Sequence, residues 1–265
     1  MGPDAFVGTA VYYARYRVPY PQILLHDLAR RANVTGHGRL LDLASGPGRV
    51  ALAISSSFRD VWAVDREPEM IEVGKAEAMR RGVSNVTWTL GRAEDLQGPA
   101  DSFELITIGE AFHRLDQRLV AERSLRWLKQ GSCLAVIGCS DILSGREAWQ
   151  RVAVSVAERW TRHAFPAGWA YSSAGAKRGT NNVIQVLTAA AFENIASYTF
   201  VEHYDWTVDS IIGYLHSTSV CSRRILADNL ASFESELRSE LQALNPTGIF
   251  HEQIRFGYTL GRKPT

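Results

Sequence analysis

The stretch that decides the fold is residues 40–49, which read LLDLASGPGR. Its apolar start predicts a buried strand that enters a turn. Gly46 and Gly48 allow the backbone of that turn to approach a ligand closely. The turn leads into a helix predicted over residues 50–57, and the free N–H groups at the start of a helix favour anionic or polar ligand groups. The stretch therefore predicts an α/β domain with a ligand site at this turn.

Apolar runs and helical patterns alternate through the first half of the chain. Such alternation predicts a parallel sheet with helices on both faces and right-handed crossovers. Pro68 suits an early helical position, because its missing N–H is unused there. The predicted helices are residues 50–57, 68–81 and 117–128, and the predicted strands are residues 39–44, 60–65, 85–90, 103–108 and 133–138.

The alternation breaks after the fifth predicted strand. Residues 140–182 carry one predicted helix, over 146–163, and an aromatic, glycine-rich stretch at 165–171, so we interpret them as an insertion. The regular pattern then resumes. It predicts a strand over 195–206, helical segments over 208–216 and 228–244, and a last, antiparallel strand over 250–260.

Composition and charge argue against several functional classes. The chain has 265 residues, of which 46% are hydrophobic and 22% charged, and its net charge of +1 gives no general attraction to nucleic acid or membranes. Cys133, Cys139 and Cys221 lack metal-ligand spacing and are too few for a disulfide framework, so no metal is expected. Neither a signal peptide nor an apolar run of the roughly 20 residues that a membrane span needs is found, and a cytoplasmic protein is expected.

Two acidic residues accompany the glycine turn. Asp65 ends the next predicted strand, about 20 residues on, where a carboxylate can accept hydrogen bonds from both ribose hydroxyls of a nucleoside. Ala51 replaces the third glycine of a dinucleotide motif, which such motifs allow, so the spacing alone leaves a nicotinamide cofactor open. Asp42 decides against it, because a carboxylate just before the turn would repel a pyrophosphate but suits a ligand with a cationic amino group.

Four motifs, in order and with the right spacing, resemble those of class I methyltransferases. The first, roughly D-x-G-x-G-x-G, is matched by residues 42–48, with Ala44 in place of the first glycine. The second, a strand that ends in an acid, is matched by residues 63–65. The third, often G-D-A-E-x-L, is matched by residues 91–96, with arginine at the position of the usual acid. The fourth, in which an apolar strand separates S-F-D from F-H, is matched by residues 102–113.

The resemblance implies a Rossmann-like α/β fold with a seven-stranded, mostly parallel sheet, helices on both faces, an antiparallel last strand and a helical insertion after the fifth strand. It implies a single domain over residues 1–265. Within it we expect N-terminal lid helices (1–36), a cofactor-binding core (37–139), a substrate-cap insertion (140–182) and C-terminal strands and helices (183–265).

The implied cofactor is S-adenosyl-L-methionine. Carried onto this sequence, the motifs place cofactor-binding residues at the glycine turn, after the second strand, in the third motif and after the fourth strand. These residues are Asp42, Ala44, Ser45, Gly46, Pro47, Gly48, Asp65, Arg66, Met70, Ala93, Glu94, Gly109 and Glu110.

Residues 13–21 are similar to the lead segment of the small-molecule enzymes of this group. This segment precedes the first strand and must cross the mouth of the sheet, so its aromatic and basic side chains are predicted to form a lid. The alternative is an amphipathic helix docked on the core. The predicted lid residues are Tyr12, Tyr13, Tyr16 and Arg17. The candidates for the acceptor pocket, each of which core packing would also explain, are Trp169, Tyr171, Trp206, Tyr214 and His216.

His113 follows the fourth predicted strand, at the end of the sheet where ligands bind. It is predicted to act as a general base if the acceptor must lose a proton. The alternative is a capping or packing histidine near Asp116.

The leading hypothesis is methyl transfer to a small organic acceptor, such as a secondary metabolite or a cofactor precursor. A nucleic-acid substrate is disfavoured, because residues 109–112 do not resemble the N-P-P-Y motif of enzymes that act on base amino groups. Two rivals stay open: a protein of this fold that binds the cofactor without transferring methyl, and a nicotinamide-dependent oxidoreductase. The acceptor atom and the oligomeric state are not predicted.

Overall fold

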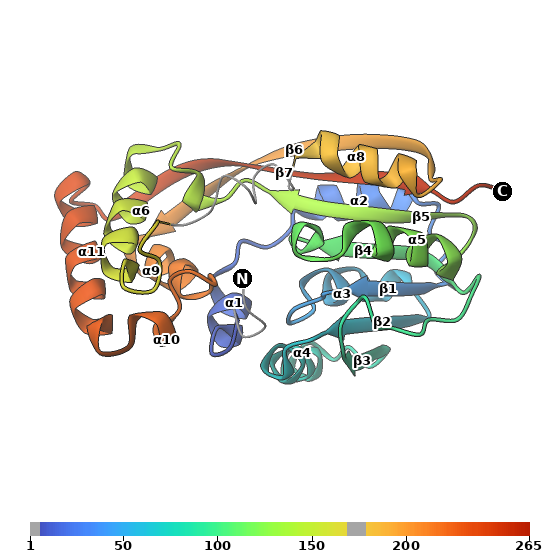
Figure 1. The fold of residues 1–265 in the computed structure, drawn as a ribbon, viewed down its shortest axis with the longest axis horizontal. Helices are drawn as coiled ribbons and strands as arrows, with labels where there is room; N and C mark the ends of the chain where they lie inside the picture. The colour runs from blue at the N-terminus through green and yellow to red at the C-terminus, as the bar shows by residue number, and fades with distance from the viewer. Residues whose placement is uncertain (1–5, 169–178) are drawn as a thin grey trace. The chain divides into compact units, whose positions relative to one another are not determined.

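The computed structural model describes residues 6–168 and 179–265. Its strands form one seven-stranded sheet in the order β3-β2-β1-β4-β5-β7-β6 (Figure 1). The strands are β1 (Arg39–Leu43), β2 (Asp60–Asp65), β3 (Val86–Leu90), β4 (Phe103–Gly109), β5 (Leu128–Cys139), β6 (Glu193–Thr207) and β7 (Ile249–Arg262).

The sheet is parallel from β3 to β5. β1 pairs with β2 and with β4, β2 pairs with β3, and β4 pairs with β5, all in the parallel sense. β7 is antiparallel to β5. The sequence predictions of a seven-stranded, mostly parallel sheet and of an antiparallel last strand are confirmed. The strand order reverses between β1 and β4, and ligands of such sheets bind beyond the carboxyl ends of the strands at this point.

The chain forms two compact units. We call residues 19–139, 179–200 and 256–265 the sheet unit, and residues 6–18, 140–168 and 201–255 the helical unit. β6 and β7 contribute residues to both. Of the predicted insertion at 140–182, residues 140–168 belong to the helical unit, together with chain segments far from them in sequence, whereas residues 179–182 belong to the sheet unit. The assignment of the whole chain to one domain stays a prediction.

The core of the sheet unit is built from strands that are buried on both faces. α5 and α8 pack on one face, where Val120 and Leu187 share a hydrophobic cluster with Leu41 and Ile106. Successive side chains of a strand point to opposite faces of the sheet. The side chains on the other face, among them Leu40, are equally buried, so both faces of these strands are covered. The helices of this unit are α2 (Gln22–Arg31), α3 (Arg49–Ile54), α4 (Pro68–Arg81), α5 (Gln117–Trp127) and α8 (Thr180–Ala189), with the 3-10 turns η1 (Ser55–Ser57) and η2 (Phe112–Arg114).

Local sequence explains where several of these helices begin and end. α4 starts at Pro68 and is terminated by Gly82, the residue after its end, whose left-handed backbone (φ 69°) lets its N–H donate to carbonyls of the last turn. α5 starts after Asp116, whose carboxylate accepts the backbone N–H of Leu119. These punctuating residues place the loops that follow the strands, and the candidate site is built on those loops.

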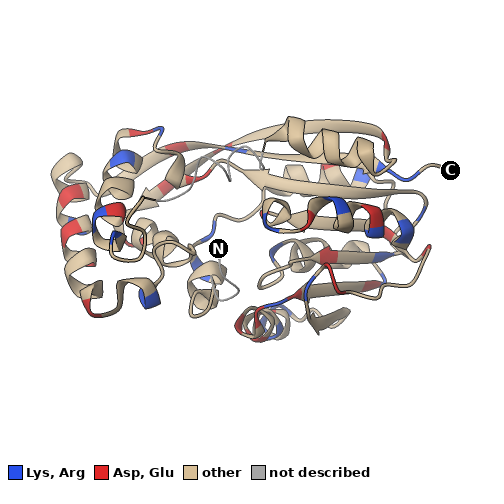
Figure 2. Ribbon diagram, in the orientation of Figure 1, with Lys and Arg blue, Asp and Glu red and all other residues tan. Residues whose placement is uncertain are grey.

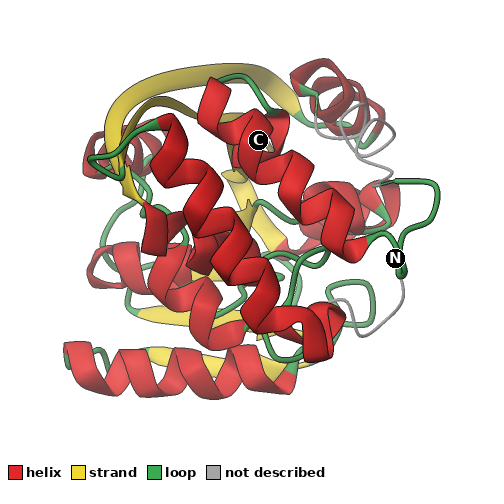
Figure 3. Ribbon diagram, turned by 90° about the vertical axis from the view of Figure 1, so that its left-hand side faces the viewer, coloured by secondary structure: helices red, strands yellow, loops and turns green. Residues whose placement is uncertain are grey.

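The helical unit consists mainly of helices; Figure 3 colours the helices of both units red and the strands yellow. α6 packs against α11, and α1 packs against α9. Its core is aromatic: the indole of Trp206 lies near Trp149 and Tyr214 and donates to the buried carboxylate of Glu252. The elements are α1 (Ala10–Tyr16), η3 (Ile142–Ser144), α6 (Ala148–Thr161), α9 (Val208–His216), α10 (Arg223–Leu226), η4 (Ala227–Asn229) and α11 (Leu230–Leu244).

Two elements differ from the sequence-based expectation. β5 begins at Leu128, five residues before the predicted start, because Lys129–Ser132 continue the strand although they are polar or small. α8 was not predicted, and only its packing against α5 shows that its apolar residues form one face of a helix. No helix among the described residues is long and apolar enough to span a membrane. Basic and acidic residues are interspersed along the helices (Figure 2), and the net charge of the whole chain is +1.

Candidate functional site

The glycine turn between β1 and α3 has three left-handed residues. Ala44 (φ 52°), Gly46 (φ 56°) and Gly48 (φ 78°) alternate with Ser45 and Pro47. Such dihedrals are cheap for glycine but strained for alanine, whose Cβ approaches its own carbonyl. The turn is closed by a hydrogen bond from the Gly48 N–H to the Ser45 carbonyl (3.0 Å). The predicted turn residues therefore form one compact loop at the carboxyl end of β1.

Asp65 connects this loop to the end of β2. Its Oδ2 accepts the backbone N–H of Gly46 (2.7 Å), and its Oδ1 accepts that of Glu67 (2.9 Å). The residue is 7% exposed. Burial raises the pKa of the Asp65 carboxyl, and the two backbone N–H groups oppose the rise. A carboxylate has about four lone-pair sites, so it keeps the capacity to accept ligand hydroxyls while it holds the loop.

Asp42 lies inside β1 and is 1% exposed. Its Oδ1 accepts the hydroxyl of Thr107 on β4 (2.7 Å), and its Oδ2 accepts the backbone N–H of Ala51 on α3 (3.1 Å). Burial raises the pKa of this carboxyl to about 7, against the effect of those two donors. Asp42 thus ties β1, β4 and α3 together beneath the glycine turn, a role that the sequence analysis missed. Its predicted contact with a cationic amino group stays a prediction.

The space in which a side chain at Gly48 would lie is occupied by Trp88, a residue 40 positions further along the chain. A Cβ at Gly48 would lie 2.5 Å from Cη2 of Trp88, and a Cβ at Gly74 of α4 would lie 2.4 Å from the same atom. The two glycines together form a slot for the Trp88 ring, which supports the turn from the protein side. A ligand-binding turn and an aromatic support therefore share one glycine. Nothing in the sequence motif indicates Trp88.

The end of β4 is shaped by Tyr20, which precedes α2. A Cβ at Gly109 would lie 2.8 Å from the Tyr20 hydroxyl and 3.2 Å from Cγ2 of Val50. Glu110 follows with a left-handed backbone (φ 59°), and its Oε1 accepts the backbone N–H of Cys139 (2.7 Å). This carboxylate therefore fastens the loop after β4 to the end of β5. Gly109 and Glu110 are predicted site residues, whereas nothing in the sequence pattern indicates Tyr20.

The remaining predicted cofactor residues lie in the loops after β2 and β3. Met70 and Ala93 are buried, whereas Arg66 is exposed and pairs with Glu67 (3.3 Å). Glu94 accepts the backbone N–H of Asp116 (3.1 Å) and lies 3.4 Å from Nε of Arg92. Arg92, which replaces the usual acid, thus forms an ion pair with Glu94, two residues further along the chain. Like the residues of the turn, these four stay predictions as cofactor contacts.

His113 is in η2, between the buried Phe112 and the exposed Arg114. It is half-buried, and the turn that holds it begins just after Glu110. The cap of α5 is made by Asp116 through Leu119, so His113 is not the capping residue of that helix. Its role as a base stays a prediction.

The four predicted lid residues belong to the helical unit, where Tyr12, Tyr16 and Arg17 contact α9 and the residues after it, and Tyr13 contacts Phe6 and Arg17. The ring of Tyr16 fills the space beside Gly213, where a Cβ would lie 2.4 Å from it. Tyr12 meets His216 edge-on and accepts a hydrogen bond from Arg223. The docked-helix alternative therefore describes what α1 does within this unit, and the lid role stays a prediction.

Arg17 and Tyr214 are brought together in the helical unit. The Arg17 guanidinium lies between the rings of Tyr13 (4.8 Å) and Tyr214 (4.4 Å). It donates to the Tyr214 hydroxyl (3.0 Å), which donates in turn to Asp141 (3.0 Å). Of the other acceptor-pocket candidates, Trp206 and His216 are buried among aromatic side chains. Trp169 and Tyr171 lie outside the described residues.

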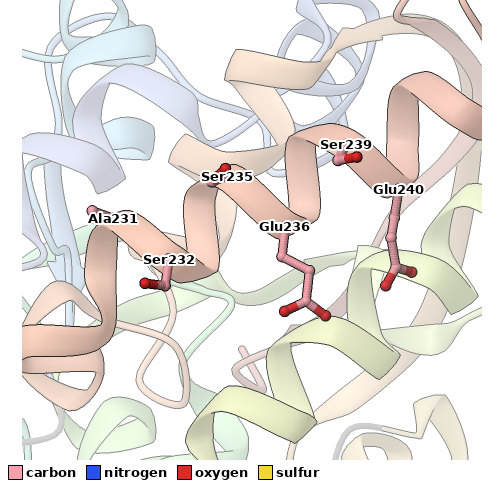
Figure 4. Close-up of a pocket in the computed structure, with 6 residues that line it drawn as sticks. All are labelled: Ala231, Ser232, Ser235, Glu236, Ser239 and Glu240. Atoms are coloured by element: carbon pink, nitrogen blue, oxygen red, sulfur yellow. The ribbon is translucent and has the colours of Figure 1, made fainter.

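A hollow of about 530 Å³ lies along α11 (Figure 4). Ala231, three serines and the carboxylates of Glu236 and Glu240 line it, and both carboxylates pair with Arg159 of α6. None of the predicted site residues that lie in the described part of the chain lines this hollow. Within residues 6–168 and 179–265, no group of three or more histidine, cysteine or acidic side chains could hold a metal ion.

Comparison with known sequences supports the reading of the glycine loop. Residues 40–131 match the family model of a methyltransferase domain. The uncharacterized methyltransferase YcgJ of Bacillus subtilis is 38% identical over 104 residues, which are 39% of this chain and 41% of that protein. The sequence match thus spans less than half of that relative's length.

Solved structures extend the likeness to the whole fold. The crystal structure of YcgJ has a TM-score of 0.56 at 20% identity, covering 92% of this chain and 100% of that one. Phosphoethanolamine N-methyltransferase 2 of Haemonchus contortus, bound to phosphomonomethylethanolamine and S-adenosylhomocysteine, has a TM-score of 0.55 at 15% identity, covering 97% and 57%. The [4+2]-cyclase SpnF has a TM-score of 0.55 at 17% identity, covering 94% and 84%. At these identities the likeness shows the fold alone.

Proposed function

We propose that this chain transfers a methyl group from S-adenosylmethionine to a small organic acceptor, because residues 40–131 match the family model of a methyltransferase domain and form strands of a sheet with the order expected for the class I type. Asp65 carries the proposal. Its buried carboxylate holds Gly46 and Glu67, at the ends of two parallel strands, and retains acceptor capacity for ribose hydroxyls. A nucleoside fits this combination of a left-handed glycine turn and a carboxylate.

The residues of the loops divide the work of binding. The turn at Gly46 would pass close to the ligand, Asp65 would accept from the ribose, and Glu94 with the backbone of Ala93 would face the adenine. When bound, S-adenosylmethionine supplies a methyl group already activated on a sulfonium. The protein is then required to align the acceptor with that group and to exclude water.

His113 is the proposed base for an acceptor that must lose a proton. It follows the Gly109–Glu110 turn, which Glu110 fastens to the end of β5, and it is half-buried. An imidazole at such a place could take a proton from a hydroxyl or amine acceptor. An acceptor that needs no proton removal would be methylated by alignment alone.

A second candidate function is binding of the cofactor without methyl transfer. The likeness to SpnF, a [4+2]-cyclase, supports this candidate, because a protein of the same fold catalyses a reaction other than methyl transfer. The two functions differ in their product. Release of S-adenosylhomocysteine with an acceptor supports methyl transfer, and product formation from an acceptor without it supports the second candidate.

Calorimetric binding of S-adenosylhomocysteine tests the proposal on the purified chain. Asp65→Ala should weaken binding by about 10-fold or more, because the ribose loses charge-assisted hydrogen bonds. Asp60→Ala is the matched control, since Asp60 starts the same strand that Asp65 ends and pairs with Arg39 and Arg59 at the surface. Unchanged affinity in Asp65→Ala, or tighter binding of NADH than of S-adenosylhomocysteine, would contradict the proposal.

A further inference from the structure

We propose that Trp88 is a rigid spacer between the glycine turn and α4, and that it sets the spacing on which ribose recognition by Asp65 depends. The inference rests on the function proposed above, in which Asp65 accepts hydrogen bonds from the ribose hydroxyls of the cofactor. It adds a positioning residue that the sequence motifs do not contain. Trp88 is assigned an action through the backbone around Asp65, without contact to the ligand.

The carboxylate of Asp65 is oriented by two separate parts of the chain. Its Oδ2 accepts the backbone N–H of Gly46 in the turn (2.7 Å), and its Oδ1 accepts that of Glu67, the residue before α4 (2.9 Å). With one oxygen held on each side, the carboxylate must rotate or lose a hydrogen bond if the turn and the start of α4 move relative to each other. The spacing of these two elements therefore decides how the remaining lone pairs face a ligand.

The Trp88 ring lies between these same two elements. A Cβ at Gly48, which ends the turn, would lie 2.5 Å from Cη2 of this ring. A Cβ at Gly74 of α4 would lie 2.4 Å from the same atom and 2.5 Å from Cζ3. The indole is planar and rigid, and closely packed contacts transmit displacements instead of absorbing them. The tip of the ring thus sets how closely the turn can approach α4.

The neighbouring strand leaves room for the ring. Trp88 lies in β3, at one edge of the sheet, and its Cα partner in β2 is Ala63. Paired residues of adjacent strands point to the same face, and the buried Ala63 carries only a methyl group, so the indole can lean across β2 toward Gly48. Trp62 points to the opposite face and packs on Phe103, with 5.4 Å between the ring centroids. A second indole therefore lies on the other side of the sheet and serves as a control.

Two ligands separate ribose recognition from a general loss of binding. They are S-adenosylhomocysteine and its 2′-deoxyribose form, which lacks one of the hydroxyls assigned to Asp65. By calorimetry, the wild-type protein should prefer the ribose form by about 10-fold, the size expected for one charge-assisted hydrogen bond. Trp88→Leu should weaken S-adenosylhomocysteine about 10-fold and the deoxy form about 3-fold, so that the preference falls to about 3-fold. A residue that only stabilised the fold would leave the preference unchanged.

Trp62→Leu is the matched control, because it removes an indole of the next strand from the opposite face of the sheet. It should lower the melting temperature and keep the preference for ribose. Melting curves show which variants are folded at the assay temperature. Trp88→Phe, the milder change, should give an intermediate loss of affinity. Gly74→Ala in that background should restore part of it, because the new methyl group fills space that the shorter ring leaves.

The outcomes separate the inference from the function on which it rests. An unchanged preference for ribose in both Trp88 variants, or the same selective loss in Trp62→Leu, overturns the inference while the proposed function stands. A wild-type protein that binds neither ligand, or that binds both equally, contradicts the proposed function itself, because Asp65 carries it.

Discussion

Ala44 offers a direct measurement of strain in the glycine turn. It has a left-handed backbone (φ 52°) at the position where the class I motif has glycine. Left-handed φ costs an alanine about 1–2 kcal/mol relative to glycine, through the approach of its Cβ to the carbonyl. Glycine also increases the conformational entropy of the unfolded chain, which lowers the free energy of unfolding by about 0.4–1 kcal/mol and offsets part of this gain. Ala44→Gly should therefore stabilise the protein by about 0.5–1 kcal/mol.

Thermal melting followed by circular dichroism is the assay, and a gain of this size corresponds to roughly 1–4 °C in a chain of this length. Two control variants bracket the effect. Ala191→Gly, at a left-handed residue (φ 65°) after α8, should raise the melting temperature by a similar amount. Ala76→Gly, at an exposed helical position of α4, should cost about 0.5–1 kcal/mol. If Ala44→Gly melts at or below the wild-type temperature while Ala191→Gly melts above it, strain at Ala44 is refuted.

Three further predictions concern the same edge of the sheet. Gly48→Ala should lower the melting temperature by several degrees, because its Cβ would lie 2.5 Å from Trp88. The double variant with Trp88→Leu should recover part of this loss. An equal loss in the single and double variants would contradict the steric cause. Burial raises the pKa of Asp42 from 3.8 to about 7, so the folded protein binds more protons than the unfolded chain between these values, and its free energy of unfolding should fall by a few kcal/mol as pH rises from about 4 to 7. Urea denaturation across this range should show a shallower fall for Asp42→Asn, and an identical slope would remove Asp42 as the cause. His113→Ala should lower kcat by about 100-fold or more with cofactor affinity unchanged if His113 is the base, and turnover that survives the substitution would exclude that role.

The sequence was sufficient to predict the sheet and the location of the turn. The apolar runs of β1, β2 and β4 and the glycines that follow β1 are local patterns, and each fixes a strand, a turn or a helix start within a few residues. β5 was predicted to start five residues too late and α8 was missed, because their weaker local patterns depend on partners elsewhere in the chain. The positions of the candidate cofactor residues follow from the same patterns, since loops after parallel strands share one edge.

What only the tertiary structure decided is which partner each of these residues meets. Gly48 is small because Trp88 occupies the adjacent space, and Gly109 is small because the Tyr20 hydroxyl does. From the sequence, Asp42 is predicted to face a cationic group of the ligand, yet in the fold Thr107 and Ala51 donate hydrogen bonds to its two oxygens. These pairs lie between 9 and 89 residues apart, and contacts at such separations form only when the strands assemble. Strand and turn propensities are encoded locally, whereas burial and hydrogen-bond partners depend on the packed sheet.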